Sequence, residues 1–291
     1  MRIAAFTYQQ QDLVGLVSAD GLYVAPFVLS AEQAALGALP IVERQARAEA
    51  LPAVLPALAL AAVTLRAPLP RPRRNLFCVG KNYHAHAREF ARSGFDSSAK
   101  AGGDIPAHPI IFTKVPECVI APGAAIEIPV GVSSAIDYEA ELAVVIGRGG
   151  KGIRKADAMA HVWGYTIVND VTARDWQNRH MQWHMGKSFD TFCPMGPWLV
   201  RADSVDAAGM QLRCWVNGEE RQNASTRDLI FDIPTLIETL SAGITLYPGD
   251  VIATGTPVGV GIGFTPPKYL QSGDSVRITI DGLGTLENPV R

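Results

Sequence analysis

The chain has 291 residues, of which 48% are hydrophobic, and its 26 basic and 28 acidic residues give a net charge of −2. This length supports one large domain or two smaller ones with a real core. The near balance of charges excludes a nucleic-acid partner bound through a global basic surface.

Targeting and membrane signals are weak. The amino terminus turns polar too early for a signal peptide. The longest apolar run, residues 51–65, is broken by Pro52 and Pro56 and is too short to cross a bilayer, so no membrane partner is expected. The four cysteines lie far apart without a pair motif, which is typical of a protein in a reducing cytoplasm.

The first 70 residues predict a small α+β unit. Residues 2–8 and 13–25 favour strands, the second folded at an Asp-Gly turn. Residues 31–65 are rich in Ala, Leu and Glu and predict helix. Three closely spaced prolines then mark a domain boundary near residue 70, so we expect a small N-terminal domain over 1–70 and a larger domain over 71–291.

The larger domain reads as many short strands with few helices. Residues 232–243 predict a helix with Asp232 as N-cap, Pro234 in the first turn and Gly243 at the end. The pattern therefore predicts an α+β fold that is mostly β. Further helices are predicted over 155–162 and 171–181, and strands over 109–114, 125–130, 137–147, 162–171, 211–217, 250–256 and 275–280.

Carboxylates alternate in "DYEAELAVVIG", where Asp137, Glu139 and Glu141 would share one face of a strand. Buried charges need a partner or a metal. Asp170 ends the strand "TIVND", and a neighbouring strand could bring it beside Glu139 and Glu141. Three carboxylates without Cys or His suit a hard cation, best Mg²⁺, with Mn²⁺ or Ca²⁺ as alternatives. The competing interpretation is a polar edge face whose acids are solvated or paired with Lys or Arg.

Two further segments carry residues suited to catalysis. In "CVGKNYHAHAREF", His86 and Glu89 are three apart and share a helix face, so the carboxylate could hold the imidazole as a general base. In "HMGKSFDTF", Lys187 could neutralise an anionic substrate. Each feature alone also fits an ordinary surface pair or a solvated lysine. His180 and His184 have zinc-helix spacing but lack the adjacent acid, so no zinc site is predicted.

Five motifs occur in a characteristic order: "VGKNYHAHARE", "DYEAELAVVIG", "NDVTARDWQ", "GKSFDTFCPMGP" and "GDVIATGTPVGVG". Over residues 74–291 the chain resembles the fumarylacetoacetate hydrolase family, in particular its smaller members that act on 2-oxo acids. The resemblance implies a mostly β, mixed-sheet roll that usually forms dimers, so a homodimer is expected. Residues 1–70 resemble the variable small N-terminal domain of such proteins.

The resemblance also implies roles for single residues. Asp137 is left out of the metal set and is expected to face a Lys or Arg. By their own composition, polar and Gly-rich after the proposed base, residues 87–108 are expected to form a lid over the substrate, with a mobile surface loop without a gating role as the alternative. The implied metal ligands are Glu139, Glu141 and Asp170; the catalytic residues are His86 as base, Glu89 as its orienter and Lys187 at the developing charge; the substrate contacts are Arg174, Gln177 and Thr256.

The activity expected from this resemblance is metal-dependent hydrolysis of a C–C bond in a small 2-oxo or 2,4-dioxo acid, with release of pyruvate. The same enolate intermediate permits three alternatives: an oxaloacetate tautomerase, a 2-hydroxyhepta-2,4-diene-1,7-dioate isomerase and an oxaloacetate decarboxylase. A rival of another class is a metabolite-binding protein without activity. Such a binder has no need of His86 and Glu89.

Overall fold

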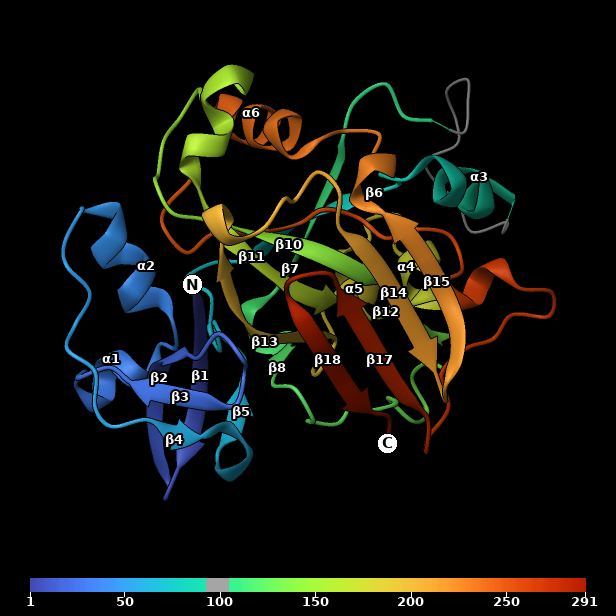
Figure 1. The fold of residues 1–291 in the computed structure, drawn as a ribbon. Coiled ribbons are helices and arrows are strands. Elements are labelled where there is room, and N and C mark those ends of the chain that lie inside the picture. Colours follow the sequence, from blue (N-terminus) through green and yellow to red (C-terminus); the bar gives the residue numbers. More distant parts are fainter. Residues whose placement is uncertain (93–104) are drawn as a thin grey trace.

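A computed structural model describes residues 1–92 and 105–291. Within these residues the chain is mostly β, with a large mixed sheet, a four-stranded sheet and a short two-stranded pair, as the sequence predicts. The four-stranded sheet lies across the strands β10 and β11 of the large sheet (Figure 1). Apolar side chains from both sheets, such as Ile167, Leu212 and Ile278, belong to one buried core.

The large sheet contains twelve of the described strands and is antiparallel except where β6 meets β16 and β8 meets β13. Its central strand β10 is buried along its whole length, which explains its near-continuous apolar sequence. In order across the sheet the strands are β4 (Leu58–Ala59), β3 (Tyr23–Pro26), β2 (Gln11–Val17), β1 (Arg2–Tyr8), β13 (Cys193–Arg201), β11 (Val162–Asn169), β10 (Ala140–Ile146), β16 (Val251–Ala253), β6 (Leu76–Gly80) and β7 (Ile110–Lys114), with β5 (Thr64–Arg66) on β1 and β8 (Val119–Ile120) on β13.

The four-stranded sheet is antiparallel and contains an Asn217–Gly218 hairpin turn, where both residues have positive φ, 52° and 81°. Its order is β15 (Glu219–Ser225), β14 (Gln211–Val216), β17 (Ser275–Ile280) and β18 (Gly284–Pro289). The short pair consists of β9 (Ile136–Asp137) and β12 (Thr172–Ala173). This pair matters for function because it holds the start of the acidic segment against the chain that follows β11.

The helices are short and lie at the edges of the sheets. Helix α6 has the predicted bounds, and Asp232 caps it by accepting a hydrogen bond from the Thr235 N–H at 2.9 Å. The segment Lys155–His161 is a 3₁₀ helix rather than the predicted α-helix. The described α-helices are α1 (Ala31–Ala35), α2 (Leu39–Ala46), α3 (His84–Arg92), α4 (Arg174–Arg179), α5 (His184–Lys187) and α6 (Ile233–Gly243).

Two further secondary-structure predictions are wrong. Instead of one helix over 31–65, the chain forms two short helices, Ala31–Ala35 and Leu39–Ala46, separated at Gly37, whose φ is 64°. Beyond Ala46 it forms the short strands β4 and β5, and Pro52 and Pro56 have no N–H for a helical hydrogen bond there. The strand predicted over 125–130 forms only a single bridge, from Ile126 to Val290. Pro129 lacks the N–H that would continue a ladder there.

The N-terminal strands continue the large sheet. β1 pairs with β13 through Arg2↔Val200 and Ile3↔Leu199, so the sheet runs without a break from the first 70 residues into the rest of the chain. Among the described residues, no helix is long and apolar enough to cross a membrane.

Candidate active site

Glu139, Glu141 and Asp170 converge at the ends of two neighbouring strands. Register pairs Ala140 on β10 with Asn169 on β11, and the Asp170 N–H donates to the Glu139 carbonyl at 2.8 Å. One carboxylate oxygen of each residue lies within 4.8 Å of the other two, and all three side chains are buried. The predicted meeting of Asp170 with the two glutamates is confirmed. The acids are buried and β10 is not an edge strand, which excludes a solvated edge face, but Lys and Arg do pair with them as the competing interpretation allowed.

Two lysines meet this cluster. The Lys187 ammonium on α5 donates to Glu139 Oε2 at 2.7 Å and to Asp170 Oδ2 at 2.8 Å. The Lys114 ammonium at the end of β7 donates to Asp170 Oδ1 at 2.7 Å. Both ammonium groups are buried, so these are ion pairs in a medium where charge attraction is strong. The position of Lys187 shows that the cluster attracts a cation.

Asp137 lies beside the cluster and pairs with Arg174, as the sequence predicts for this acid. Arg174 Nε donates to Asp137 Oδ2 at 2.8 Å, and Arg174 Nη2 lies 2.7 Å from Glu139 Oε1. Asp137 also accepts the N–H groups of Gly261 and Ile262 at 2.6 and 3.0 Å. The strand is interrupted after Asp137. The Asp137 side chain still lies on the same side as Glu139, since the Arg174 guanidinium pairs with both carboxylates.

The charges explain why two neighbouring glutamates behave differently. Burial opposes ionisation of Glu139, but Lys187 and Arg174 outweigh it and lower the pKa of Glu139 to about 2. Burial and the charges of Asp170 and Glu139 raise the pKa of Glu141 well above its ordinary value. The three buried cations Lys114, Lys187 and Arg174 therefore balance the three carboxylates Asp137, Glu139 and Asp170. Glu141 stays neutral when no further cation is bound.

The donor set fits a hard divalent cation. Its three groups are carboxylates, which Mg²⁺, Mn²⁺ and Ca²⁺ prefer, and the Glu141 side chain is aimed by a hydrogen bond of 2.8 Å from the Gly255 N–H to its Oε2. Glu139, Glu141 and Asp170 could therefore hold a metal ion together. The added charge of such an ion would favour the ionised form of Glu141.

Binding of a divalent cation is expected to release about one proton from Glu141 near neutral pH, because its raised pKa keeps it protonated beforehand. Affinity should therefore rise with pH until the pKa of Glu141 is passed and then level off. Calorimetric Mg²⁺ titrations in two buffers of different ionisation enthalpy measure the released protons. A pH-independent affinity without proton release would contradict the assignment.

His86 and Glu89 form the predicted pair on α3. His86 Nδ1 lies 3.0 Å from Glu89 Oε2, and Glu89 Oε1 accepts the Gly259 N–H at 3.0 Å. An ionised carboxylate can only accept, so Nδ1 carries the hydrogen and Nε2 keeps its lone pair. Gly263 permits this packing, since a Cβ there would lie 2.0 Å from Glu89 Oε1.

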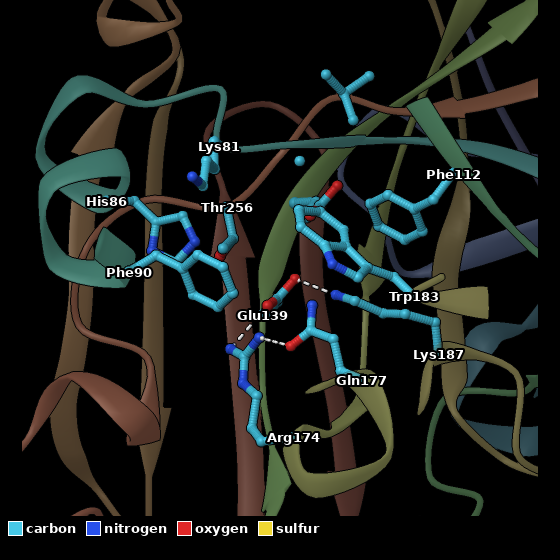
Figure 2. A pocket seen from close by; sticks show the side chains of 13 residues that line it. Lys81, His86, Phe90, Phe112, Glu139, Arg174, Gln177, Trp183, Lys187 and Thr256 are labelled. Carbon is cyan, nitrogen blue, oxygen red and sulfur yellow. Dashed lines mark hydrogen bonds and ion pairs between the residues drawn. The ribbon is translucent and has the colours of Figure 1, made fainter. Parts of the chain in front are cut away.

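One pocket collects most of these side chains, as Figure 2 shows. Glu89 and Asp170 lie behind it and act on His86 and Lys187, which do line it. Its volume of about 10 Å³ suits roughly one water, so substrate entry requires wall side chains to move. The lining residues are Val79, Gly80, Lys81, His86, Phe90, Phe112, Glu139, Glu141, Arg174, Gln177, Trp183, Lys187 and Thr256.

The three predicted substrate contacts all line the pocket. Arg174 and Gln177 come from α4, where Arg174 Nη1 donates to Gln177 Oε1 at 3.1 Å. The Thr256 hydroxyl donates to the Ala140 carbonyl at 3.0 Å and accepts from Gln222 Nε2 at 2.8 Å. Its hydroxyl hydrogen is thus used within the protein, and Thr256 would meet a substrate through its backbone or its remaining oxygen lone pair.

Sequence reasoning missed Lys81, Lys114 and the aromatic walls. Lys81 directly follows Gly80 at the end of β6, and Lys114 is the last residue of β7. A basic residue at the end of an apolar strand is the sequence feature from which both lysines could have been predicted. The predicted lid over 87–108 begins as helix, because α3 continues to Arg92, and residues 93–104 lie outside the described part of the chain.

A family comparison agrees with this geometry. A sequence profile described as "Fumarylacetoacetate (FAA) hydrolase C-terminal" matches residues 75–291. The chain belongs to the fumarylacetoacetate hydrolase family. Its members include enzymes with tautomerase, isomerase and hydrolase names, and a fumarylacetoacetate hydrolase of Exiguobacterium antarcticum superposes with a TM-score of 0.85 at 38% identity, covering 100% of this chain and 99% of that one.

Other members of the fumarylacetoacetate hydrolase family are also similar. "Oxaloacetate tautomerase YisK" of Bacillus subtilis is 53% identical over 232 residues, 79% of this chain and 74% of its own. Human "Oxaloacetate tautomerase FAHD2A, mitochondrial" is 45% identical over 83% of this chain and 74% of its own. Maleylpyruvate hydrolase of Sphingobium sp. SYK-6, solved with manganese(II) and pyruvate, has a TM-score of 0.77 at 32% identity, over 100% and 98% of the two chains.

Proposed function

We propose that this protein is an oxaloacetate tautomerase that interconverts the enol and keto forms of a small 2-oxo diacid with Mg²⁺ bound by Glu139, Glu141 and Asp170. The observation that carries the proposal is the 53% identity to a Bacillus subtilis oxaloacetate tautomerase. The pocket supports it, because a base and a group of cations meet at the buried acid cluster. Tautomerisation thus takes precedence over the C–C hydrolysis expected from the sequence.

A divalent cation on the acid cluster would supply a Lewis acid and a template for the carboxylate and 2-oxo oxygen of the substrate. The chain supplies the proton transfers. His86 Nε2 would take the proton from C3 of the keto form and pass it to the C2 oxygen to give the enol, and in reverse would move it from the enol hydroxyl back to C3. Glu89 keeps the imidazole in the tautomer that this step needs and stabilises the imidazolium it produces.

Lys187 lies across the pocket from His86 (Figure 2). Its ammonium would stabilise the negative charge that develops on the C2 oxygen as the C3 proton leaves. The Phe112 ring, 4.9 Å from Lys187 Nζ, together with Trp183 shields this group from water and so strengthens its field. Arg174 and Gln177 would orient the bound substrate between the His86 imidazole and the Lys187 ammonium.

A second candidate is hydrolysis of a 2,4-dioxo acid. The favouring observation is the oriented base: His86 Nε2 is free of Glu89 and faces a pocket with room for a water. The likeness to a maleylpyruvate hydrolase at 32% identity supports it. His86 would then deprotonate a water that attacks the 4-oxo carbon, and the C3–C4 bond breaks to release pyruvate.

One assay separates the two. Enol oxaloacetate, freshly dissolved, is followed by loss of its ultraviolet absorbance with Mg²⁺ and with EDTA, while malate dehydrogenase traps the keto form and lactate dehydrogenase detects pyruvate. Metal-dependent enol loss with matching keto form and no extra pyruvate is expected. Acetylpyruvate tested in parallel should yield no pyruvate. Enol decay at the uncatalysed rate would overturn the tautomerase, and pyruvate from acetylpyruvate would establish the hydrolase.

We further propose a cytoplasmic homodimer whose residues 1–70 form a small N-terminal domain beside the catalytic domain 71–291. Four buried free thiols support a reducing compartment. Light scattering on the purified protein measures the oligomeric state, and a monomeric mass would contradict the dimer.

A further inference from the structure

Trp183 is the largest aromatic side chain that lines the pocket. Its indole lies beside Phe112 and across the pocket from His86, as Figure 2 shows. The residue immediately precedes α5, the helix that carries Lys187, and it is 8% exposed. The proposed mechanism uses the indole only to shield the Lys187 ammonium from water, which leaves its effect on the shape of the pocket without a role.

The indole of Trp183 contacts three walls of the pocket. The Phe90 ring on α3 meets it edge to face, with ring centroids 5.9 Å apart and an interplanar angle of 71°. The Phe112 ring on β7 meets it in a similar way, at 5.3 Å and 65°. The backbone of β6 lies directly against it, since a Cβ on Gly80 would be 2.2 Å from Trp183 Cζ3. Because close-packed neighbours hold it on three sides, the indole cannot turn without moving them.

Gly80 is explained by this packing. It is the last residue of β6, and its φ lies outside the left-handed region, so its own backbone conformation does not require glycine. The indole of Trp183 occupies the space that a side chain at position 80 would need. Glycine therefore serves here to let the strand approach the ring closely.

The acid cluster and His86 together orient a bound substrate. With its 2-oxo head on the cluster and its C3 beside His86, the substrate directs the group carried by C3 along α3. Phe90 follows His86 by one turn of this helix, and its contact with Trp183 closes the pocket there. Since the volume is only about 10 Å³, a group on C3 fits only as far as these two rings can separate.

We propose that Trp183 determines specificity by limiting the group on C3 of the 2-oxo acid to about the size of a carboxylate. This inference rests on the proposed function. A larger group would meet the indole, which cannot retreat freely because Gly80 and Phe112 pack against it. Such a clash excludes 2-oxo acids with an aromatic ring on C3, and a smaller residue at position 183 should admit them.

The test uses two unreactive ligands that share one head. Oxamate and N-phenyloxamate carry nitrogen in place of C3, so neither undergoes the reaction, and only the second carries an aromatic ring there. Their dissociation constants are measured by calorimetry with Mg²⁺ for the parent and for Trp183→Ala, Trp183→Phe and Trp215→Ala. Trp215 lies on β14, is not among the residues that line the pocket, and serves as the matched control.

The parent is expected to bind N-phenyloxamate roughly 10- to 100-fold more weakly than oxamate, the usual effect of overfilling a packed site. Trp183→Ala should remove most of this difference, Trp183→Phe should remove part of it, and Trp215→Ala should match the parent. Comparing the two ligands within each variant cancels any loss caused by water entry, because such a loss affects the shared head equally.

Three results would overturn the inference: a parent that does not bind oxamate, a parent that binds both ligands equally, or an unchanged ratio of the two dissociation constants in Trp183→Ala. If Trp183→Ala does not fold, the ratios measured for the parent and for Trp183→Phe decide.

The two proposals fail separately. A parent that excludes N-phenyloxamate through Trp183 but leaves enol oxaloacetate unchanged would refute the tautomerase and keep the size limit. A parent that converts enol oxaloacetate while Trp183→Ala still excludes N-phenyloxamate would keep the tautomerase and refute the role of Trp183.

Discussion

Glu141→Gln is expected to abolish divalent-cation binding while leaving the metal-free protein as stable as the parent. Without a cation Glu141 is held neutral by burial and by its carboxylate neighbours, and glutamine has nearly its shape. The amide oxygen can still accept the Gly255 N–H. The free energy of unfolding should therefore change by less than about 1 kcal/mol. The Mg²⁺ affinity should fall more than about 100-fold, because loss of a direct metal ligand exceeds the usual effect of changing a residue that only hydrogen-bonds to a ligand.

Asp170→Asn gives the opposite pattern for stability. Asp170 pairs with both Lys114 and Lys187 in the interior, and asparagine would leave the Lys114 ammonium without a carboxylate. Breaking a buried ion pair on one side costs about 3–5 kcal/mol. Urea unfolding in EDTA measures both variants, with calorimetry for Mg²⁺. Equal destabilisation by the two substitutions would contradict the charge assignment of the cluster.

His86→Ala is expected to lower kcat on enol oxaloacetate about 10²- to 10⁴-fold, the usual contribution of a positioned general base. Binding of oxalate, which mimics the substrate head, should change little, because the head lies on the acid cluster and not on the imidazole. His84→Ala is the matched control, since His84 is an exposed histidine on the same helix. Steady-state kinetics and oxalate inhibition separate the two effects.

Glu89→Gln tests how the base is prepared. The Gly259 N–H donates to one Glu89 oxygen, so the glutamine oxygen would stay there and its NH₂ group would face His86 Nδ1. The imidazole would then carry its hydrogen on Nε2 and could not accept a proton from the substrate. A loss comparable with that of His86→Ala is expected. Near-parental activity of either variant would remove the pair from the mechanism.

Much of the site could be predicted because local spacing determines it. His86 and Glu89 meet through one turn of helix, and Arg174 and Gln177 share a face of α4 for the same reason. Helix α6 follows from its own cap, proline and apolar face. The order of five motifs indicated the family. Extended segments were less certain, because partners distant in sequence decide whether a segment such as 125–130 pairs as a strand.

The sequence by itself determined which chemical groups the site contains: three carboxylates, an oriented imidazole and a lysine. Only the tertiary structure decided how charge is divided among them. The register of β10 and β11 brings Asp170 beside Glu139, and β7 places Lys114 against Asp170. Burial then makes Glu139 ionised and Glu141 neutral, because solvation and charge attraction depend on distances between residues far apart in the chain. The same dependence placed Lys81 on the pocket wall opposite the acid cluster.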